Sequence, residues 1–323
     1  MVEVSIILVN WNTRELTLRC LDSLSDGAEP DVSYEVLVVD NGSTDGSARA
    51  LEARTDIGRL IVNDENRGYA EGVNQAYAAA NGELLLLLNS DVVFPRSSLS
   101  TLVRFLRERD DAAGVAPLYL NPDGTPQQHY YRLPTFRAIL ANSNGLLRRL
   151  PPFTRWIRAY RMLDDDFSRP RLVPQPSASC LLLRRSSLPD GHLLDEHLPI
   201  YFNDVALARR LADEGKRLWM TPDATVVHEH GASTRLIGGT HRRQHLGALV
   251  RYLKATEPRP LVLAFQALAL TQGAASRLLR RPHSLPLSDL WRAARGDPGP
   301  LPQAPATPET NEIEPATTER ARP

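Results

Sequence analysis

Residues 84–94 read LLLLLNSDVVF, and this stretch decides how the rest of the chain can fold. Five consecutive leucines predict a strand that is buried on both faces, as in the middle of a parallel sheet. The leucines run into Asn89, Ser90 and Asp91 before three more apolar residues follow. A carboxylate at the mouth of a buried strand costs free energy unless a partner compensates it. Asp91 therefore either caps a helix or holds a cation or a ligand.

Strand and helix patterns alternate around this stretch. Apolar runs predict strands at 4–10, 34–40, 59–64 and 83–90. Capping residues and helical spacing predict helices at 15–24, 43–54 and 68–80. Continuous apolar strands separated by helices predict an α/β protein with a mostly parallel sheet that is covered by helices on both faces.

The pattern changes after Phe94. The sequence predicts a helix at 98–109, and then proline- and glycine-rich connections with many arginines to about residue 176. A strand at 177–188, a helix at 206–218 and a short strand from residue 221 follow. From residue 282 the chain has few large apolar residues, so we expect a disordered tail.

Length and cysteine content bound the class of protein. With 323 residues, 42% of them hydrophobic, the chain can bury one large core or two modest ones. Cys20 and Cys180 lie far apart and predict neither a disulfide framework nor a zinc site, which favours the cytoplasm. MVEVSIILVNWN at the start lacks a signal-peptide pattern. The best apolar run, LVLAFQALAL at 261–270, is too short to span a bilayer.

Charge is distributed unevenly in a chain whose formal net charge is zero. Nine Arg or Lys residues and a single acid, Glu257, lie between Arg235 and Arg281. This block is typical either of a surface for anionic lipid or phosphate or of a solvated helix face. Residues 132–185 hold eleven arginines against three aspartates, which suits a phosphate-bearing acceptor. Nucleic acid is not expected, because no aromatic platform or known nucleic-acid module accompanies the arginines.

Four polar clusters fall where predicted strands end, which is where open parallel sheets bind ligands. They are Asn10-Trp11-Asn12, Asp40-Asn41-Gly42, Asn66-Arg67-Gly68 and Asn89-Ser90-Asp91. Neither a GxGxxG fingerprint nor a P-loop is present in the sequence. A nucleotide would therefore be held mostly by side chains.

Several motifs, taken in order, resemble the nucleotide-sugar domain of family 2 glycosyltransferases with the GT-A fold. The resemblance covers roughly residues 3–235. Two later segments, DGTPQQ and NDVALARR, more specifically resemble the rhamnosyltransferase-type members of this family. The motifs are VSIILVNWN, VLVVDNGSTDGS, NRGYAEGVNQA, LLLLNSDVVF, DGTPQQ (123–128), YFNDVALARRL (201–211) and HEHGAS (228–233).

The resemblance divides the chain into functional regions. Residues 1–95 would form the nucleotide-sugar-binding half, and 96–235 the acceptor-binding and catalytic half of the same GT-A domain. A basic amphipathic helical extension at 236–281 and the disordered tail at 282–323 would follow.

The same resemblance implies which residues contact the donor nucleotide. Asp40 would accept hydrogen bonds from the base or ribose, although NGSTDG also predicts an Asx-turn at this position. Arg67 would pair with phosphate, and the alternative is an arginine on a surface loop. The implied donor contacts are Val9, Asn10, Asn12, Asp40, Asn66, Arg67, Gly68, Asn74, Asn89 and Ser90.

Asn89-Ser90-Asp91 stands at the position of the family's DxD motif, with Asn89 replacing the first acid. Asp91 would bind a divalent cation that bridges the donor phosphates, and oxygen ligands suit Mg²⁺ or Mn²⁺. His228, which fits an H-x-x-G-x-S element, would complete this metal site. A helix cap at Asp91 is the weaker alternative, since the residues after it do not begin a helix.

Asp204 matches the family's catalytic carboxylate and would act as the general base of an inverting transfer. An N-cap is the structural alternative. Asn203 and Ala206 depart from the acids that many relatives carry at these two positions. Gln127, Gln128 and His129 lie where a donor-sugar or acceptor loop would fall, and they have no assigned role.

These observations together predict an inverting glycosyltransferase. We expect it to move L-rhamnose from dTDP-L-rhamnose onto a cell-envelope or surface-polysaccharide acceptor, such as a polyprenyl-diphosphate-linked glycan. A UDP-hexose or UDP-galactofuranose transferase of the same fold is the first alternative. A non-catalytic nucleotide-sugar-binding protein is the second. The expected location is the cytoplasm, with peripheral contact at the inner face of the cell membrane.

Overall fold

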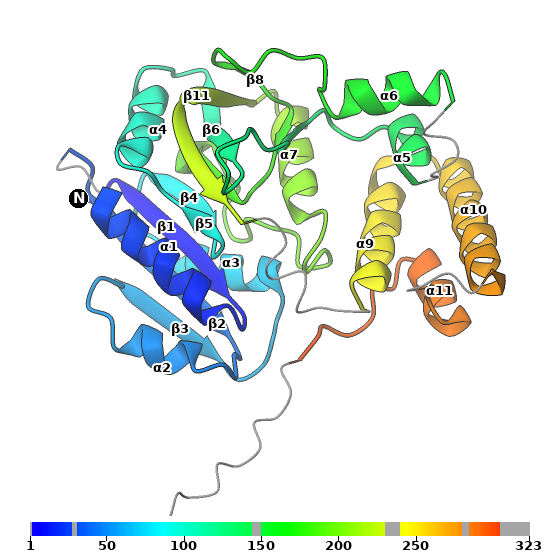
Figure 1. Ribbon diagram of the computed structural model, residues 1–323, viewed down its shortest axis with the longest axis horizontal. Helices are drawn as coiled ribbons and strands as arrows, with labels where there is room; N and C mark the ends of the chain where they lie inside the picture. Colours follow the sequence, from blue (N-terminus) through cyan, green and yellow to red (C-terminus); the bar gives the residue numbers. More distant parts are fainter. Residues whose placement is uncertain (1, 28–30, 144–149, 230–239, 280–283, 304–323) are drawn as a thin grey trace, which may run out of the picture.

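The computed structural model describes residues 2–27, 31–143, 150–229, 240–279 and 284–303. Its centre is a nine-stranded sheet in the order β3-β2-β1-β4-β10-β6-β11-β5, with β8 paired to β11 beside this path (Figure 1). The strands of the first half are β1 (Val4–Asn10), β2 (Tyr34–Asn41), β3 (Arg59–Asn63), β4 (Leu84–Asn89) and β5 (Val92–Val93). Those of the second half are β6 (Ala112–Leu120), β8 (Arg171–Leu172), β10 (Cys180–Arg184) and β11 (Arg217–His228). A separate pair, β7 (Tyr130–Tyr131) with β9 (Gln175–Pro176), forms a second small sheet.

The predicted α/β architecture is confirmed. Strands β3, β2, β1 and β4 are mutually parallel, and β6 is parallel to β11. The helices that connect or cover them are α1 (Arg14–Gly27), α2 (Ser47–Glu52), α3 (Tyr69–Ala79), α4 (Ser98–Arg107) and α7 (Asn203–Asp213). Because parallel neighbours need crossover connections, this order follows directly from the alternation of strand and helix patterns.

The five-leucine strand lies in the interior of the sheet, as its composition predicts. All five leucines of β4 are buried, and β4 pairs with β1 on one side and β10 on the other. Leu86, for example, stands opposite Ile6 and Leu182. The strand ends at Asn89, so the polar cluster Asn89-Ser90-Asp91 emerges at the carboxyl edge of the sheet.

Strand β6 lies in a region that the sequence analysis treated as connecting loops. Its sequence AAGVAPLYL contains Gly114 and Pro117, which weaken a strand pattern. Gly114 is required by packing, since a Cβ there would lie 2.7 Å from a methyl carbon of Leu183 on β10. The same region also forms helices α5 (Phe136–Ser143) and α6 (Phe153–Tyr160).

Three C-terminal helices gather at one end of the molecule, far from β3 and α2 (Figure 1). They are α9 (His241–Thr256), α10 (Arg259–Leu278) and α11 (Leu287–Ala294). A second hydrophobic core joins α9 and α10 to α5 through Ile139, Leu249, Val250, Leu253, Val262 and Phe265. Within the predicted helical extension at 236–281, the described residues form two helices, α9 and α10.

Residues 284–303 differ from the predicted disorder. Leu290, Ala293 and Ala294 of α11 are buried, and Pro298 packs against Gly247 of α9. Composition favours disorder because the partners that order this segment are distant in the chain, such as Gly273 for Leu290 and Gly247 for Pro298. Residues 304–323 lie outside the described residues, so disorder there stays a prediction.

Within the described residues, one helix is long and apolar enough to cross a membrane by length and composition, namely α10. The sequence analysis judged the run at 261–270 too short. The helix reaches 20 residues because Arg259 and Pro260 precede this run and residues 271–278 follow it. Only 11% of its most apolar window is buried against the protein.

Candidate active site

A pocket of about 700 Å³ opens at the carboxyl ends of β1 and β4. Strand β11 and the start of α7 contribute its other walls. The pocket is lined by eight of the thirteen residues singled out in the sequence: Val9, Asn66, Gly68, Asn89, Ser90, Asp91, Asp204 and His228. The remaining five, Asn10, Asn12, Asp40, Arg67 and Asn74, do not line it.

The turn after β4 is fixed from both sides, which holds Asp91 in place. The Asn89 backbone amide donates to the Ser179 carbonyl at 2.9 Å, and its side-chain amide donates to Ser179 Oγ at 3.2 Å. The hydroxyls of Ser90 and Thr13 are hydrogen-bonded at 3.0 Å. Residues 92–93 then form β5 and pair with β11, so Asp91 does not cap a helix.

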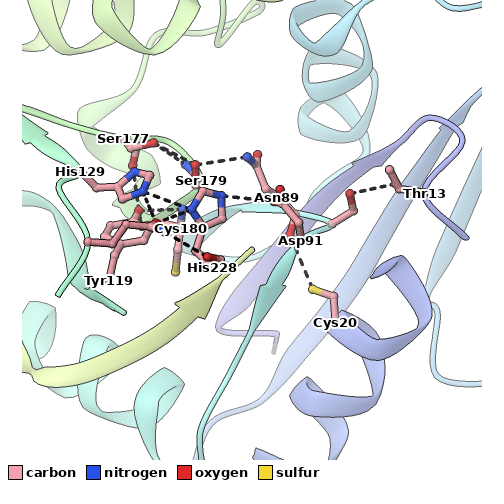
Figure 2. Close-up of polar contacts among 12 residues, drawn as sticks. Thr13, Cys20, Asn89, Asp91, Tyr119, His129, Ser177, Ser179, Cys180 and His228 are labelled. Atoms are coloured by element: carbon pink, nitrogen blue, oxygen red, sulfur yellow. Dashed lines mark hydrogen bonds and ion pairs between the residues drawn. The ribbon is translucent and has the colours of Figure 1, made fainter. Parts of the chain in front are cut away.

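Asp91 and His228 meet inside the pocket, as Figure 2 shows. Asp91 Oδ1 lies 3.3 Å from His228 Nε2, and the two residues are only 6% and 3% exposed. Asp91 lies in the turn between β4 and β5, and His228 is the last residue of β11, with which β5 pairs. The backbone amide of Glu229 also donates to the Asp91 carbonyl at 2.9 Å.

Gln127 determines the tautomer of His228. Its Nε2 donates to Asn121 Oδ1 at 2.7 Å and to the His228 carbonyl at 3.1 Å, so the amide orientation is fixed and Oε1 must accept. His228 Nδ1 lies 2.7 Å from this Oε1 and is therefore the donor. Neutral His228 consequently turns the lone pair of Nε2 toward the Asp91 carboxylate. This contact is favourable only if a proton or a metal cation lies between the two atoms.

The spacing of this pair fits two ligands of one divalent cation. Ligands at about 2.1 Å from a metal, separated by about 90–105°, stand roughly 3.0–3.3 Å apart. The observed separation is 3.3 Å. Within the described residues no group of three or more His, Cys, Asp or Glu side chains gathers at one point. A cation here would therefore take its other ligands from substrate oxygens, water or uncharged protein groups.

His129 forms a second layer behind His228. It is hydrogen-bonded to Gln127 Oε1, and its ring stacks on Tyr119 with 4.4 Å between centroids. The Tyr119 hydroxyl donates to the Cys180 carbonyl at 2.8 Å and accepts from the Cys180 amide at 2.9 Å. Burial raises the pKa of Tyr119 well above its usual value, so the hydroxyl keeps the proton that this double role needs.

Asp204 lies in the pocket wall at the start of α7. Its Oδ1 accepts from the Val205 backbone amide at 2.8 Å, and Gln175 Nε2 donates to Oδ2 at 3.5 Å. The N-cap position belongs to Phe202, which adopts a left-handed φ of 67°, so Asp204 is not the N-cap. Burial raises the pKa of the Asp204 carboxyl, and the Val205 hydrogen bond opposes this effect. A carboxylate in these surroundings is a stronger base than an exposed one.

Asn10, Asn12 and Asp40 form a hydrogen-bonded network at the ends of β1 and β2. Asn10 Nδ2 donates to Asp40 Oδ1 at 2.5 Å, and the Ser43 amide donates to Asp40 Oδ2 at 3.0 Å. The Thr44 amide donates to Asn12 Oδ1 at 2.7 Å. These contacts hold Asp40 within the turn, but the bond to the Ser43 amide spans three residues rather than the two of an Asx-turn. Direct contact of the three side chains with a nucleotide stays a prediction.

Arg67 and Asn74 make other contacts with the protein. Arg67 pairs with Glu71 at 3.1 Å on the surface of α3. Asn74 is buried, and it binds both the amide and the carbonyl of Leu194 at 2.9 Å. Asn74 Nδ2 also donates to Glu196 at 2.9 Å. Asn74 thus ties α3 to the loop that precedes α7.

The sequence analysis missed much of the pocket lining. The missed residues are mainly aromatic, hydroxyl and histidine side chains: Trp11, Asn41, Tyr69, Tyr131, Tyr160, Gln175, Ser177, Ser179, Tyr201, His241 and His245. Trp11 and Asn41 belong to the polar clusters at the ends of the first two predicted strands. Tyr131, Gln175, His241 and His245 come from β7, β9 and α9, where no local pattern signals a ligand. Burial lowers the pKa of His245 to about 4, so this histidine is neutral at pH 7.

The chain belongs to glycosyl transferase family 2, since residues 5–191 match the model of that family. It is 31% identical over 252 residues to N-acetylglucosaminyl-diphospho-decaprenol L-rhamnosyltransferase of Mycobacterium tuberculosis, covering 74% of this chain and 80% of the relative. It is 29% identical over 249 residues to the O-antigen biosynthesis protein RfbC of Myxococcus xanthus, covering 72% of this chain and 18% of that protein. The protein is therefore a glycosyltransferase, and the non-catalytic alternative is set aside.

Solved structures of similar fold are also glycosyltransferases. Mannosyltransferase PcManGT of Pyrobaculum calidifontis has a TM-score of 0.52 at 21% identity, with 90% of this chain and 85% of that chain covered. S. aureus TarS (residues 1–349) has a TM-score of 0.51 at 17% identity, with 91% and 90% covered. The predicted GT-A fold is confirmed.

Asn74→Ala separates a structural role from a ligand contact. The substitution leaves the buried amide and carbonyl of Leu194 unpaired, so we expect the free energy of unfolding to fall by about 1–3 kcal/mol in urea denaturation. Nucleotide affinity of the folded variant should be retained. Glu71→Ala on the exposed side of α3 is the control and should cost no more than about 1 kcal/mol. Unchanged stability with weakened nucleotide binding would instead make Asn74 the donor contact that the sequence predicts.

Proposed function

We propose that the protein transfers L-rhamnose from dTDP-L-rhamnose to a polyprenyl-diphosphate-linked glycan during cell-envelope or surface-polysaccharide synthesis. The observation that carries this proposal is one pocket holding both the Asp91–His228 pair and the basic carboxylate Asp204. The relative that shares 31% identity along most of both chains is named as a rhamnosyltransferase acting on a diphospho-decaprenol acceptor.

Asp91 and His228 would hold Mg²⁺ or Mn²⁺ at the donor diphosphate. The 3.3 Å ligand spacing and the lone pair on His228 Nε2 support this assignment. PcManGT, which has a similar fold, was solved with GDP-Man and Mn²⁺. When bound, such a cation supplies positive charge that stabilises the departing diphosphate. Asn89 supplies no charge, so Asp91 would be the sole anionic ligand of this motif.

Asp204 would act as the general base. Its carboxylate takes the proton of the acceptor hydroxyl while that oxygen forms a bond to the anomeric carbon, and the bond from this carbon to the diphosphate oxygen breaks. A single displacement of this kind inverts the anomeric centre. The hydrogen bonds from Val205 and Gln175 orient the carboxylate toward the pocket. Its raised pKa makes it a better proton acceptor.

Asp204→Asn should abolish transfer without abolishing donor binding. We expect turnover, measured as release of dTDP, to fall by about 10²–10⁴-fold, the usual contribution of a general base. The dissociation constant for dTDP, measured by calorimetry, should change little. Asp213→Asn, on the exposed end of α7, is the matched control and should remain active. Full activity of Asp204→Asn would contradict the assignment.

The pH profile gives an independent test of the same residue. Because the pKa of Asp204 is raised, kcat/KM should rise with pH through a value above the ordinary 3.8 of aspartate.

A donor screen distinguishes dTDP-L-rhamnose from UDP-hexoses and UDP-galactofuranose by which donor gives nucleotide release.

EDTA should weaken nucleotide binding if Asp91 and His228 hold a cation. For the native protein we expect dTDP affinity to fall by at least about tenfold. Loss of a residue that merely hydrogen-bonds to a metal ligand already lowers metal affinity or activity by this factor. Asp91→Asn should have low affinity with or without EDTA, whereas Asp111→Asn at the far edge of the sheet should respond like the native protein. Equal affinity of the native protein in both conditions would exclude the metal role.

We also propose that α10 and α11 rest on an anionic membrane surface. Between Arg259 and Arg277 helix α10 carries no charged residue, yet most of it is exposed. Surface helices of soluble proteins normally turn charged residues outward. The lipid face consists of the exposed large apolar residues Leu261, Leu263, Leu278, Leu279, Leu287 and Trp291.

Basic residues surround the lipid face, which suits anionic headgroups. Arg259, Arg277, Arg292 and Arg295 are exposed, whereas the nearby Asp289 is paired with Arg243. Because Val262 and Phe265 of α10 are buried in the second core, the helix would lie along the membrane rather than across it. The protein would then be cytoplasmic and peripheral, with its acceptor anchored in the same lipid surface.

Vesicle sedimentation tests this contact. Native protein should bind phosphatidylglycerol vesicles more than phosphatidylcholine vesicles, and high salt should weaken the binding. Leu263→Glu combined with Trp291→Glu should abolish it, because both side chains are more than half exposed on the lipid face. Leu172→Glu on β8 is the control, as a leucine that is 45% exposed elsewhere on the protein. Unchanged binding of the double variant would contradict the proposal.

A further inference from the structure

The end of the described chain returns to the nucleotide side of the pocket. Residues 300–303, here called the C-terminal strap, meet the loop after β3 at Asn66. The Asn66 amide donates to Gln303 Oε1 at 2.8 Å, and Gln303 Nε2 donates to the Asn66 carbonyl at 3.1 Å. Asn66 Nδ2 donates to the Pro302 carbonyl at 2.8 Å. Pro302 lines the pocket together with Asn66 and Gly68.

The start of the strap is held on α9. Gln244 Nε2 of α9 donates to the Pro300 carbonyl at 2.8 Å, and Arg251 Nε donates to the Gly296 carbonyl at 2.6 Å. These contacts fix the chain up to residue 300 on α9. Gln303 itself is exposed. Its two hydrogen bonds can therefore exchange for those of water or a ligand while residues 296–300 stay in place.

The contact between Gln303 and Asn66 has a distinct chemical pattern. The main chain of Asn66 offers one donor and one acceptor side by side, and a single carboxamide satisfies both. The edge of thymine or uracil that carries N3–H beside a carbonyl oxygen has the same donor and acceptor arrangement as that carboxamide. A base of this kind could bind the Asn66 main chain as Gln303 does.

We propose that the main-chain edge of Asn66 reads the pyrimidine base of the donor, and that Gln303 holds this edge as an internal mimic of the base. The proposal rests on the proposed function, since it assumes a nucleotide-sugar donor. The nucleotide and the strap then compete for one site. Donor binding requires residues 301–303 to move away. The measured affinity is then the intrinsic affinity multiplied by the fraction of molecules in which the strap is open.

The pocket contacts of the strap support competition rather than simple anchoring. Leu301 lies over the backbone of Gly68, where a Cβ would come within 3.3 Å of its Cδ1 and 2.9 Å of the Pro199 Cβ. The closed strap thus covers the loop that leads into α3. This loop is tied to β2, since Asn41 Nδ2 donates to the Gly68 carbonyl at 2.9 Å, and it lines the pocket together with Asn41 and Trp11 on the side of β1 and β2. The base end of a nucleotide whose diphosphate lies at Asp91 would reach this side.

Gln303→Ala in the full-length chain tests the proposal. Loss of two exchangeable hydrogen bonds should increase the affinity for dTDP and UDP by about 3- to 10-fold in calorimetry. Inorganic pyrophosphate with the same divalent cation has no base, so its affinity should not change. Gln266→Ala on α10 is the matched control and should leave both affinities unaltered.

Three results would overturn the inference. Weaker nucleotide binding by Gln303→Ala would make Gln303 a part of the donor site rather than a competitor. Equal changes for dTDP and pyrophosphate, or no change in either, would remove the link to the base. If one of these results is found while transfer from dTDP-L-rhamnose is intact, only the strap inference fails. Absence of nucleotide binding in both native protein and variant would overturn the proposed function together with it.

Discussion

The candidate active site is organised around the approach of one carboxylate to one imidazole nitrogen inside the protein. Asp91 Oδ1 and His228 Nε2 are 3.3 Å apart and almost inaccessible to water. Gln127 Oε1 faces Nδ1 on the other side of the ring, so Nε2 of a neutral His228 would turn its lone pair toward the Asp91 carboxylate. Burying two electron-rich groups together is costly unless positive charge lies between them. The short pairing of β5 with β11 maintains this arrangement, because Asp91 directly precedes β5 and His228 is the last residue of β11.

Much of the fold could be predicted because its signals are local. The leucines of β4, the capping residues before the early helices and the polar clusters at strand ends depend on neighbours a few positions apart. Asp91 and His228 were identified from short motifs for the same reason. Sequence could not show which polar side chains point inward: Asn10 and Asp40 satisfy each other, whereas Asn89 and Ser90 face the pocket.

The remaining parts were missed because their partners are distant in the chain. Strand β6 contains Gly114 and Pro117, and it is stabilised by β10 and β11 rather than by its own propensity. Gln127 gains its role only when Asn121 and His228 are brought to it. Gln303 meets Asn66 across 237 positions of sequence, a contact that no local pattern encodes. Composition alone describes residues 284–303 as a tail, and tertiary packing orders them.

The position of β10 links the two halves of the enzyme during synthesis. Strand β4 has β1 on one side, but its other edge is covered by residues 180–184, which are made almost a hundred positions later. A nascent chain that ends before β10 would expose an unpaired edge of five leucines, a surface prone to intermolecular pairing. The nucleotide-binding half is thus a region of the sheet and not a unit that could be excised. Until β10 has been synthesised, the nascent chain needs either rapid elongation or a chaperone to remain soluble.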